Sequence, residues 1–285
     1  MLNPALRIVR RPISCAMRPV CAVLLLSLLS LLLILESTPS HAVIGGERMK
    51  LSMALTQYVV AITYKDENGE SKHCTGGIIG SHIVLTAAHC VPKDQSTMGV
   101  VVGETIFHDK AVAVLPVATV RIHPLYEKSR TEFDNPYDLA VIKTRDPLPP
   151  HSRHLQLADR YFPVSLISKV YVIGYGVSGF DKKGQSINTG TLNAAIVTRA
   201  GDDDDEKMFR LDQTKGTGIC VGDSGGPMLV QNAHGFIIMG LATTVFNAYD
   251  NKGPGVCSGR ANHVSASYFR HWIMKQAFEL MQVNR

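Results

Sequence analysis

An all-β fold, either a sandwich or a barrel, is the class that this sequence predicts. After residue 42, short runs rich in β-branched and aromatic residues alternate with turns that contain glycine. The chain has 285 residues, of which 45% are hydrophobic and 19% are charged. This size and composition suit one or two compact domains with a sizeable core, and they argue against a disordered chain.

The predicted strands follow one another at short intervals. A run at residues 59–64 precedes a turn at 65–69. A hairpin is expected where the apolar runs 78–79 and 83–85 flank Gly80-Ser81. Further strands are expected at 100–102, 112–122, 139–144, 170–173, 192–197 and 236–244.

One helix is predicted, at the end of the chain. Its apolar residues recur with a period of 3.6 and share one face: Phe269, Trp272, Ile273, Ala277 and Leu280. We expect this face to pack on a core.

A stiff break near the middle divides the chain into two predicted parts. Pro147, Pro149 and Pro150 are typical of an inter-domain linker. We therefore expect one domain in residues 43–150 and a second in residues 151–285.

Residues 1–42 are predicted to be a signal peptide. Four arginines precede an uncharged, mostly apolar run at 19–35, in which leucine dominates. A polar stretch then ends in Ser40-His41-Ala42, with small residues three and one positions before the expected cut. An uncleaved membrane anchor is the alternative, although the apolar run is short for a span. A cleaved signal implies a secreted or periplasmic protein, without a membrane partner, in a compartment where cysteines pair.

Charge and cysteine content narrow the function further. The net charge of +5 is mild, and part of it lies in the leader, so it does not predict binding to nucleic acid or to a membrane surface. Beyond the leader four cysteines remain, and four cysteines allow three pairings between which composition cannot choose.

Three short motifs carry residues suited to nucleophilic catalysis. Ser224 lies in Gly222-Asp223-Ser224-Gly225-Gly226-Pro227, where the glycines allow a tight turn that exposes the hydroxyl. His89 follows an apolar strand in Thr86-Ala87-Ala88-His89-Cys90, and Asp138 precedes the apolar run 139–142. Serine is a poor nucleophile without an adjacent base. Taken singly, the three motifs also fit a plain turn, a core histidine and a strand cap.

The order His, Asp, Ser and the motifs around these residues resemble the trypsin/chymotrypsin family of serine proteases. The resemblance covers nearly all of residues 43–285. It includes further landmarks: Val43-Ile44-Gly45-Gly46, His123-Pro124-Leu125-Tyr126, Gly174-Tyr175-Gly176 and the terminal helix with Trp272. The resemblance implies two six-stranded antiparallel Greek-key barrels with a C-terminal helix, and an active site between the barrels.

The resemblance also implies a role for each residue of the motifs. Ser224 would be the nucleophile, His89 the general base and Asp138 the group that orients the histidine. The N–H groups of Gly222 and Ser224 would form the oxyanion hole. Asp223 would pair with a free amino group at Val43, so that activity would depend on where the chain is cut.

The substrate pocket is inferred from the same resemblance. Gly218, six residues before the nucleophile, would lie at the pocket base, and no acid is present there to select lysine or arginine. Ile219 would add an apolar wall. Thr243, Val245 and Gly255 would border the pocket, with Val245 narrowing the entrance in an elastase-like way. We expect cleavage after small or medium aliphatic residues, with larger apolar residues as the alternative.

The cysteines follow the family only in part. Cys74 and Cys90 flank the strands that lead to His89, as in the family, and are expected to form a disulfide. Cys220 matches a family cysteine whose usual partner would lie just after Val245. Cys257 stands further along the chain, so either the bridge has moved or both thiols are free. Export favours a bridge.

Cofactors and other partners are not predicted. Neither a zinc motif nor a phosphate-binding glycine loop is present, and the acidic run at 202–206 is more typical of a solvated loop than of a calcium site. The expected partner is a protein or peptide substrate, and the expected state is a monomer. A non-catalytic binding protein of the same fold is the alternative function, but it would be marked by loss of a triad residue.

Overall fold

The computed structural model describes residues 43, 54–106, 113–129, 135–163, 166–181, 183–187, 189–200, 205–233, 235–246 and 257–283. These residues belong to one compact unit. The predicted signal peptide, Gly255 and most of the acidic run lie outside the described residues. In the part of the chain that is described, no helix is long and apolar enough to span a membrane.

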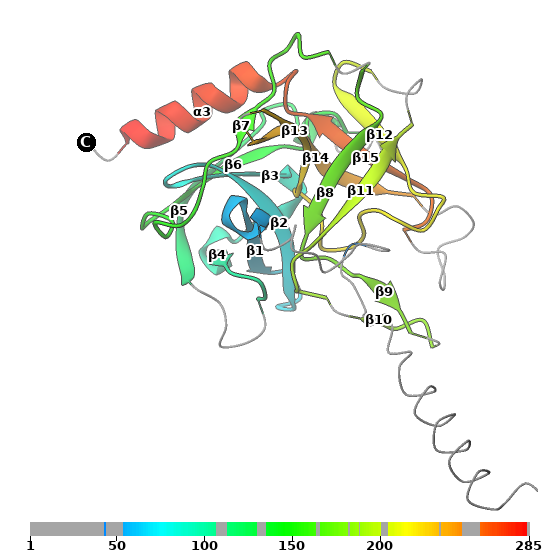
Figure 1. Ribbon diagram of the computed structural model, residues 1–285. Coiled ribbons are helices and arrows are strands. Elements are labelled where there is room, and N and C mark those ends of the chain that lie inside the picture. Colours follow the sequence, from blue (N-terminus) through cyan, green and yellow to red (C-terminus); the bar gives the residue numbers. More distant parts are fainter. Residues whose placement is uncertain are drawn as a thin grey trace, which may run out of the picture. The chain divides into compact units, whose positions relative to one another are not determined.

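The first half of the chain forms a closed antiparallel barrel in the order β1-β2-β3-β6-β5-β4 (Figure 1). A short 3₁₀ helix, η1 (Thr56–Tyr58), precedes the first strand, and three more lie between strands: η2 Ala88–Cys90, η3 Gln95–Thr97 and η4 Glu127–Ser129. The six strands are β1 Val59–Lys65, β2 Ser71–Gly80, β3 Ile83–Thr86, β4 Gly99–Val102, β5 Ala113–Ile122 and β6 Ala140–Thr144.

The second half forms another six-stranded ring. Pairing runs from β13 through β8, β11, β12, β15 and β14, and β14 pairs again with β13. The strands are β8 Lys169–Gly174, β11 Asn193–Arg199, β12 Met208–Asp212, β13 Pro227–Asn232, β14 Gly235–Val245 and β15 Arg260–Ser265. The short β7 (Gln156–Leu157) adds to β14 in parallel, and β9 (Gly179–Phe180) pairs with β10 (Ser186–Ile187). The prediction of two antiparallel barrels is confirmed.

Several strands are buried on both faces, which explains why their sequences are nearly continuous hydrophobic runs. Successive side chains of a strand point to opposite faces. In β1, Val60 and Ile62 belong to a cluster formed by the first half of the chain. Val59 and Ala61 belong to a second cluster, which also contains residues of the other barrel such as Leu229. The core is therefore continuous between the barrels.

Helix α3 (Arg270–Gln282) follows the second barrel but reaches back to the first. Ile273 and Leu280 are fully buried, as the predicted apolar face requires. The buried ammonium group of Lys143 in β6 donates a hydrogen bond of 2.8 Å to the carbonyl oxygen of Leu280. A cation is favourable at this end of a helix, where carbonyl groups lack partners within the helix. The helix therefore ties the two barrels together.

Candidate active site

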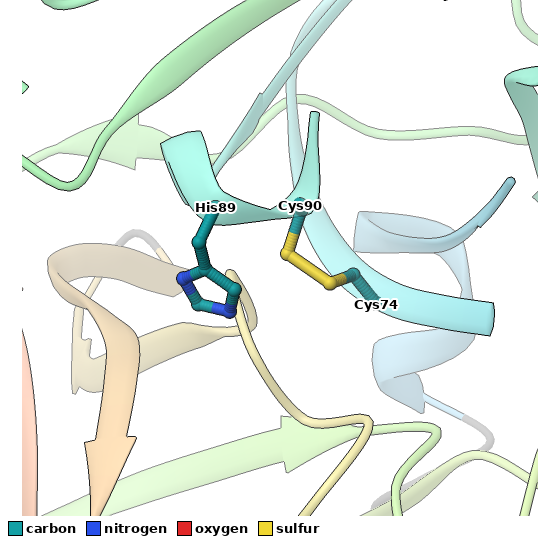
Figure 2. Close-up of side chains that lie close together, drawn as sticks. All are labelled: Cys74, His89 and Cys90. Carbon is teal, nitrogen blue, oxygen red and sulfur yellow. A yellow bond between two sulfur atoms is a disulfide. The ribbon is translucent and has the colours of Figure 1, made fainter. Parts of the chain in front are cut away.

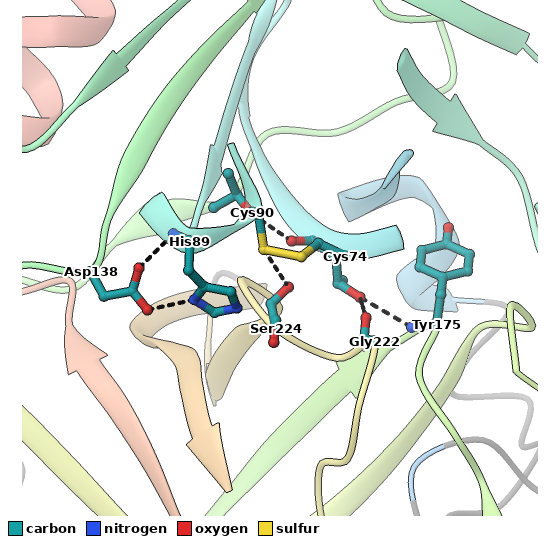
Figure 3. The surroundings of a disulfide bond; sticks show 9 residues. Cys74, His89, Cys90, Asp138, Tyr175, Gly222 and Ser224 are labelled. Atoms are coloured by element: carbon teal, nitrogen blue, oxygen red, sulfur yellow. Dashed lines mark hydrogen bonds and ion pairs between the residues drawn. A yellow bond between two sulfur atoms is a disulfide. The ribbon is translucent and has the colours of Figure 1, made fainter. Parts of the chain in front are cut away.

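Strand pairing brings His89 and Asp138 together. His89 lies in η2, just after β3, and Asp138 lies just before β6. β3 and β6 are antiparallel neighbours, with Thr86 opposite Ala140. The His89 ring Nδ1 lies 2.6 Å from Asp138 Oδ2, and the backbone N–H of His89 donates to Oδ1 at 2.9 Å (Figure 3). Both carboxylate oxygens of Asp138 are therefore used to hold the histidine.

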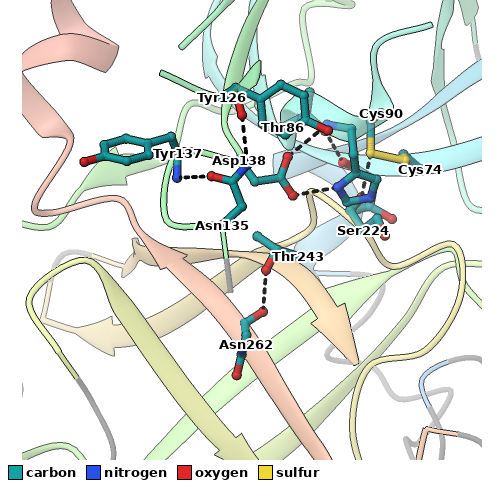
Figure 4. Close-up of polar contacts among 12 residues, drawn as sticks. Cys74, Thr86, Cys90, Tyr126, Asn135, Tyr137, Asp138, Ser224, Thr243 and Asn262 are labelled. Carbon is teal, nitrogen blue, oxygen red and sulfur yellow. Dashed lines mark hydrogen bonds and ion pairs between the residues drawn. A yellow bond between two sulfur atoms is a disulfide. The ribbon is translucent and has the colours of Figure 1, made fainter. Parts of the chain in front are cut away.

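A turn of defined geometry holds Asp138 in place (Figure 4). The Asn135 side chain donates to the carbonyl oxygen of Tyr126 at 3.1 Å and accepts from the Tyr137 N–H at 3.0 Å. Behind this turn, the His123 ring stacks on Tyr137 at 5.1 Å and lies 4.9 Å from Trp272 of α3. The landmark 123–126 therefore supports the turn before Asp138 rather than contributing to the reacting centre.

The charge of Asp138 controls the electrostatics of His89. Burial alone would lower the pKa of the imidazole, but the nearby carboxylate and its hydrogen bond outweigh burial and raise the pKa above its ordinary value of 6.5. Asp138 is almost fully buried, whereas the side chain of His89 is 34% exposed. His89 can therefore exchange a proton with a molecule in solution.

Ser224 lies in the loop between β12 and β13, next to the His89 ring in Figure 3. The two glycines that flank Asp223-Ser224 adopt positive φ values, +96° at Gly222 and +75° at Gly225. A Cβ atom at Gly225 would overlap the backbone N of Ala87, close to η2. Glycine is therefore required at position 225 for the loop of Ser224 to approach the segment of His89.

Thr75 of β2, which the sequence analysis did not single out, joins this loop to the first barrel. Its backbone N–H donates to the carbonyl oxygen of Ser224 at 2.8 Å, and its hydroxyl donates to that of Gly222 at 3.0 Å. The same hydroxyl accepts from the Tyr175 N–H at 3.1 Å. One fully buried residue thus positions both Gly222 and Ser224.

Gly222 and Ser224 differ from the residues next to them in the hydrogen bonding of their backbone N–H groups. The N–H groups of Asp223, Gly225 and Gly226 donate to carbonyl oxygens within the protein. Among the described residues, the N–H groups of Gly222 and Ser224 have no such acceptor. This pair is the one that the sequence analysis assigned to the oxyanion hole.

Asp223 is fully buried beneath the same loop. Its Oδ1 accepts from the N–H of Gly176 and its Oδ2 from the N–H of Cys220, each at 2.8 Å. Burial raises the pKa of this carboxyl group to about 7, although the two N–H donors act in the opposite direction. Val43 is also fully buried, in a cluster with Ile219, and it has a φ of 60°, which is unusual for a β-branched residue.

The predicted pocket residues differ in their surroundings. Gly218 is buried, and Ile219 is 2% exposed with its side chain in the core. The Thr243 hydroxyl donates to the carbonyl oxygen of Asn262 at 3.3 Å (Figure 4). Val245 packs on a small cluster that contains Cys220 and Cys257.

The segment between Cys257 and β15 contains Gly259, which the sequence analysis did not assign to the predicted pocket. Gly259 donates from its N–H to the carbonyl oxygen of Phe246 at 2.9 Å, and its own carbonyl oxygen accepts from the Gln213 N–H at 2.9 Å. Gly259 therefore holds the strand of Val245 opposite the segment that precedes Gly218.

Two disulfides brace the site. Cys74 and Cys90 are bonded with an S–S distance of 2.04 Å, and Cys220 and Cys257 with 2.08 Å. Figure 2 shows the first bond beside His89. Among the described residues, Cys74, His89 and Cys90 are the only three potential metal ligands that cluster. The sulfur atoms of Cys74 and Cys90 are bonded to each other. A cysteine binds a metal as a free thiolate, so these two cysteines cannot do so while the disulfide is intact.

An open cleft of about 650 Å³ borders His89. Its lining includes Tyr64 and Tyr126 together with residues of both charges, among them Lys93 and Glu127. The cleft leaves one side of His89 open to solvent, and Ser224 is not among its lining residues.

Comparisons with known proteins agree with this arrangement. A family model described as Trypsin matches residues 43–273. Granzyme F of Mus musculus is 28% identical over 248 residues, which cover 81% of this chain and 92% of that protein. A trypsin of Simulium vittatum is 26% identical over 232 residues, covering 75% of this chain and 87% of that protein. For trypsin zeta of Drosophila melanogaster the identity is 25% over 258 residues, with coverages of 84% and 86%. Because the family model spans most of the chain and the fold is the one that the family implies, the chain belongs to the trypsin/chymotrypsin family and is a serine endopeptidase.

Proposed function

We propose that this peptidase cleaves peptide bonds through a triad of Ser224, His89 and Asp138. The observation that supports the triad most directly is the 2.6 Å contact between His89 Nδ1 and Asp138 Oδ2. With Nδ1–H donating to the carboxylate, the other ring nitrogen is left unprotonated and can act as a base. The buried carboxylate then also stabilises the imidazolium that forms during the reaction.

The reaction proceeds in two stages. His89 removes the proton of the Ser224 hydroxyl as its oxygen attacks the peptide carbonyl carbon, and a tetrahedral oxyanion forms. The N–H groups of Gly222 and Ser224 donate to that oxygen. His89 then gives its proton to the leaving amine, and the acyl-enzyme remains. A water molecule, deprotonated by the same histidine, hydrolyses the acyl-enzyme and restores Ser224.

The pH dependence of peptide hydrolysis tests this assignment. The value of kcat/KM should rise with pH as His89 loses its proton, with a midpoint above 6.5 because Asp138 raises the pKa of the imidazole. Asp138→Asn should lower activity by about 10⁴-fold, because the amide favours the wrong tautomer of the ring. A rate that stays flat from pH 5 to 8 would argue against a histidine base.

We further propose a preference for small or aliphatic residues before the cleaved bond. The support is the absence of an acid at Gly218 and the position of Val245 beside the Cys220–Cys257 disulfide. A branched side chain there narrows the entrance to the pocket. Export from the cell through cleavage of residues 1–42 remains part of the proposal, and it would supply the oxidising conditions in which both disulfides form.

Peptide substrates that differ only in the residue before the cut measure this preference. Alanine or valine substrates should exceed lysine or arginine substrates at least tenfold in kcat/KM, which corresponds to about 1.4 kcal/mol. Val245→Gly should widen the entrance and improve turnover of phenylalanine substrates. Fastest cleavage after arginine would show that the pocket base is wrongly assigned, and an unchanged phenylalanine rate in Val245→Gly would place the entrance elsewhere.

A further inference from the structure

A glutamine that follows β12 lies against the proposed pocket base. Gln213 is fully buried, and its carboxamide reaches two separate segments of the chain. Its Nε2 donates to the carbonyl oxygens of Ile219 and Cys257, at 3.0 and 2.9 Å, and its Oε1 accepts from the Ile219 N–H at 2.7 Å. Gln213 therefore joins the segment that leads to the nucleophile with the segment around the disulfide.

These contacts fix the orientation of the carboxamide. An amide nitrogen has two hydrogens to donate, and both are used here on carbonyl oxygens. If the nitrogen and oxygen exchanged places, the oxygen would face two carbonyl oxygens and the NH₂ would face an N–H. The group consequently has no N–H left for a substrate, and it carries no charge.

The carboxamide fills the space beside Gly218. A Cβ atom added at Gly218 would overlap Cγ, Cδ and Oε1 of Gln213, so a side chain at position 218 and the present position of Gln213 exclude each other. Gly218 also has a φ of +156°. The position from which an acid would select a basic substrate is thus occupied by a neutral amide that comes from elsewhere in the chain.

We propose that Gln213 closes the base of the substrate pocket and restricts cleavage to bonds that follow short, uncharged side chains. This inference rests on the proposed function, because it takes Gly218 as the pocket base. It differs from the entrance effect of Val245, since Gln213 limits the depth of the pocket and Val245 its width. A long basic side chain would be excluded because the pocket is too shallow for it and offers no negative charge to pair with it.

Three variants of the active protein separate filling of the pocket from hydrogen bonding. Gln213→Ala removes the group and should raise the ratio of kcat/KM for phenylalanine over alanine substrates at least tenfold. Gln213→Met fills a similar volume without the hydrogen bonds, so its ratio should stay within about threefold of the unmodified protein. Gln213→Asn keeps the carboxamide but retracts it by one methylene, and it should give an intermediate ratio.

Each outcome decides the question. An alanine or asparagine variant that cleaves peptides with the unmodified ratio would overturn the proposal, and so would a methionine variant that shifts the ratio as far as alanine does. If circular dichroism shows that none of the variants folds, Gln213 is a structural residue and the proposal is rejected. Failure of the unmodified protein to cleave any peptide would instead reject the proposed function.

Discussion

Replacing Ser224 by alanine should reduce peptide hydrolysis by several orders of magnitude and leave the fold intact. The loss is large because no other group of the site can take over the attack on the carbonyl carbon, and residual activity would come only from binding and from the oxyanion hole. The fold should persist because Ser224 is held through its backbone, whose carbonyl oxygen accepts from the Thr75 N–H, and alanine keeps this bond.

The measurement is kcat/KM on a peptide ester and a peptide amide, with circular dichroism and thermal unfolding as controls for folding. Ser71→Ala is a matched control, because Ser71 is an exposed serine at the start of β2. It should retain full activity. Equal activity of Ser224→Ala and the unmodified protein would reject Ser224 as the nucleophile.

The strands that could be predicted from sequence are mostly those with apolar residues on both faces. The run at 59–64 corresponds to β1, and the run at 139–144 to β6. Three strands of the second barrel, β12, β13 and β15, were not predicted. β15 contains Asn262 and His263, which are fully buried although polar, and β13 begins directly after the glycines of the nucleophile loop. Only pairing with neighbouring strands identifies such segments.

The residues of the candidate site also differ in whether they could be predicted from the sequence. His89, Asp138 and Ser224 stand in short motifs, so the proposed triad could be suggested from their order along the chain. Thr75 and Gln213 could not be assigned. The Thr75 hydroxyl donates to a residue 147 positions away, and the Gln213 amide to one 44 positions away. A buried polar side chain with backbone partners leaves no pattern in the nearby sequence, because the partners meet only in the folded chain.

The second large effect concerns the N-terminus. A protein that begins at Val43 should be fully active, whereas one that keeps His41-Ala42 should lose activity on the order of 10²–10³-fold, the usual cost of losing an oxyanion-hole donor. The reason is Asp223, which is fully buried and stands in the sequence between Gly222 and Ser224, the two proposed oxyanion-hole residues. An unpaired buried carboxylate is costly, and a free amino group at Val43 would supply the opposite charge.

Stability should reveal the same difference. We call the protein that keeps His41-Ala42 the extended protein. In it, burial holds the pKa of Asp223 at about 7, above its value of about 3.9 in an unfolded chain. The folded state then binds the extra proton, so stability falls as pH rises from about 4 to 7, by roughly 4 kcal/mol in total. In the protein that begins at Val43, the amino group stays protonated below about pH 8 and offsets this loss.

Urea unfolding of both proteins at pH 5 and pH 7.5 measures the effect. His263, whose pKa burial lowers to about 3, makes stability rise with pH between about 3 and 6.5. That contribution is common to both proteins and cancels in the difference between them. Asp223→Asn in the extended protein should abolish the fall in stability that Asp223 causes, because the buried group no longer ionises, and it should leave the rise between pH 5 and about 6.5 that His263 contributes.

The proposed route of activation depends on where the predicted leader would be cut. Lysine and arginine are absent just before Val43, so a protease with trypsin-like specificity is not expected to activate the protein. A signal peptidase that cuts after Ala42 would expose the amino group of Val43 in one step, and it would also release the preceding peptide from a residue held at a φ of 60°. A cut after Ser40 would leave His41-Ala42 to be trimmed by a second enzyme.

N-terminal sequencing of the exported protein, combined with pulse-chase labelling, distinguishes the two routes. Full activity of a protein that retains its leader would contradict both, because Asp223 would then be buried without its partner.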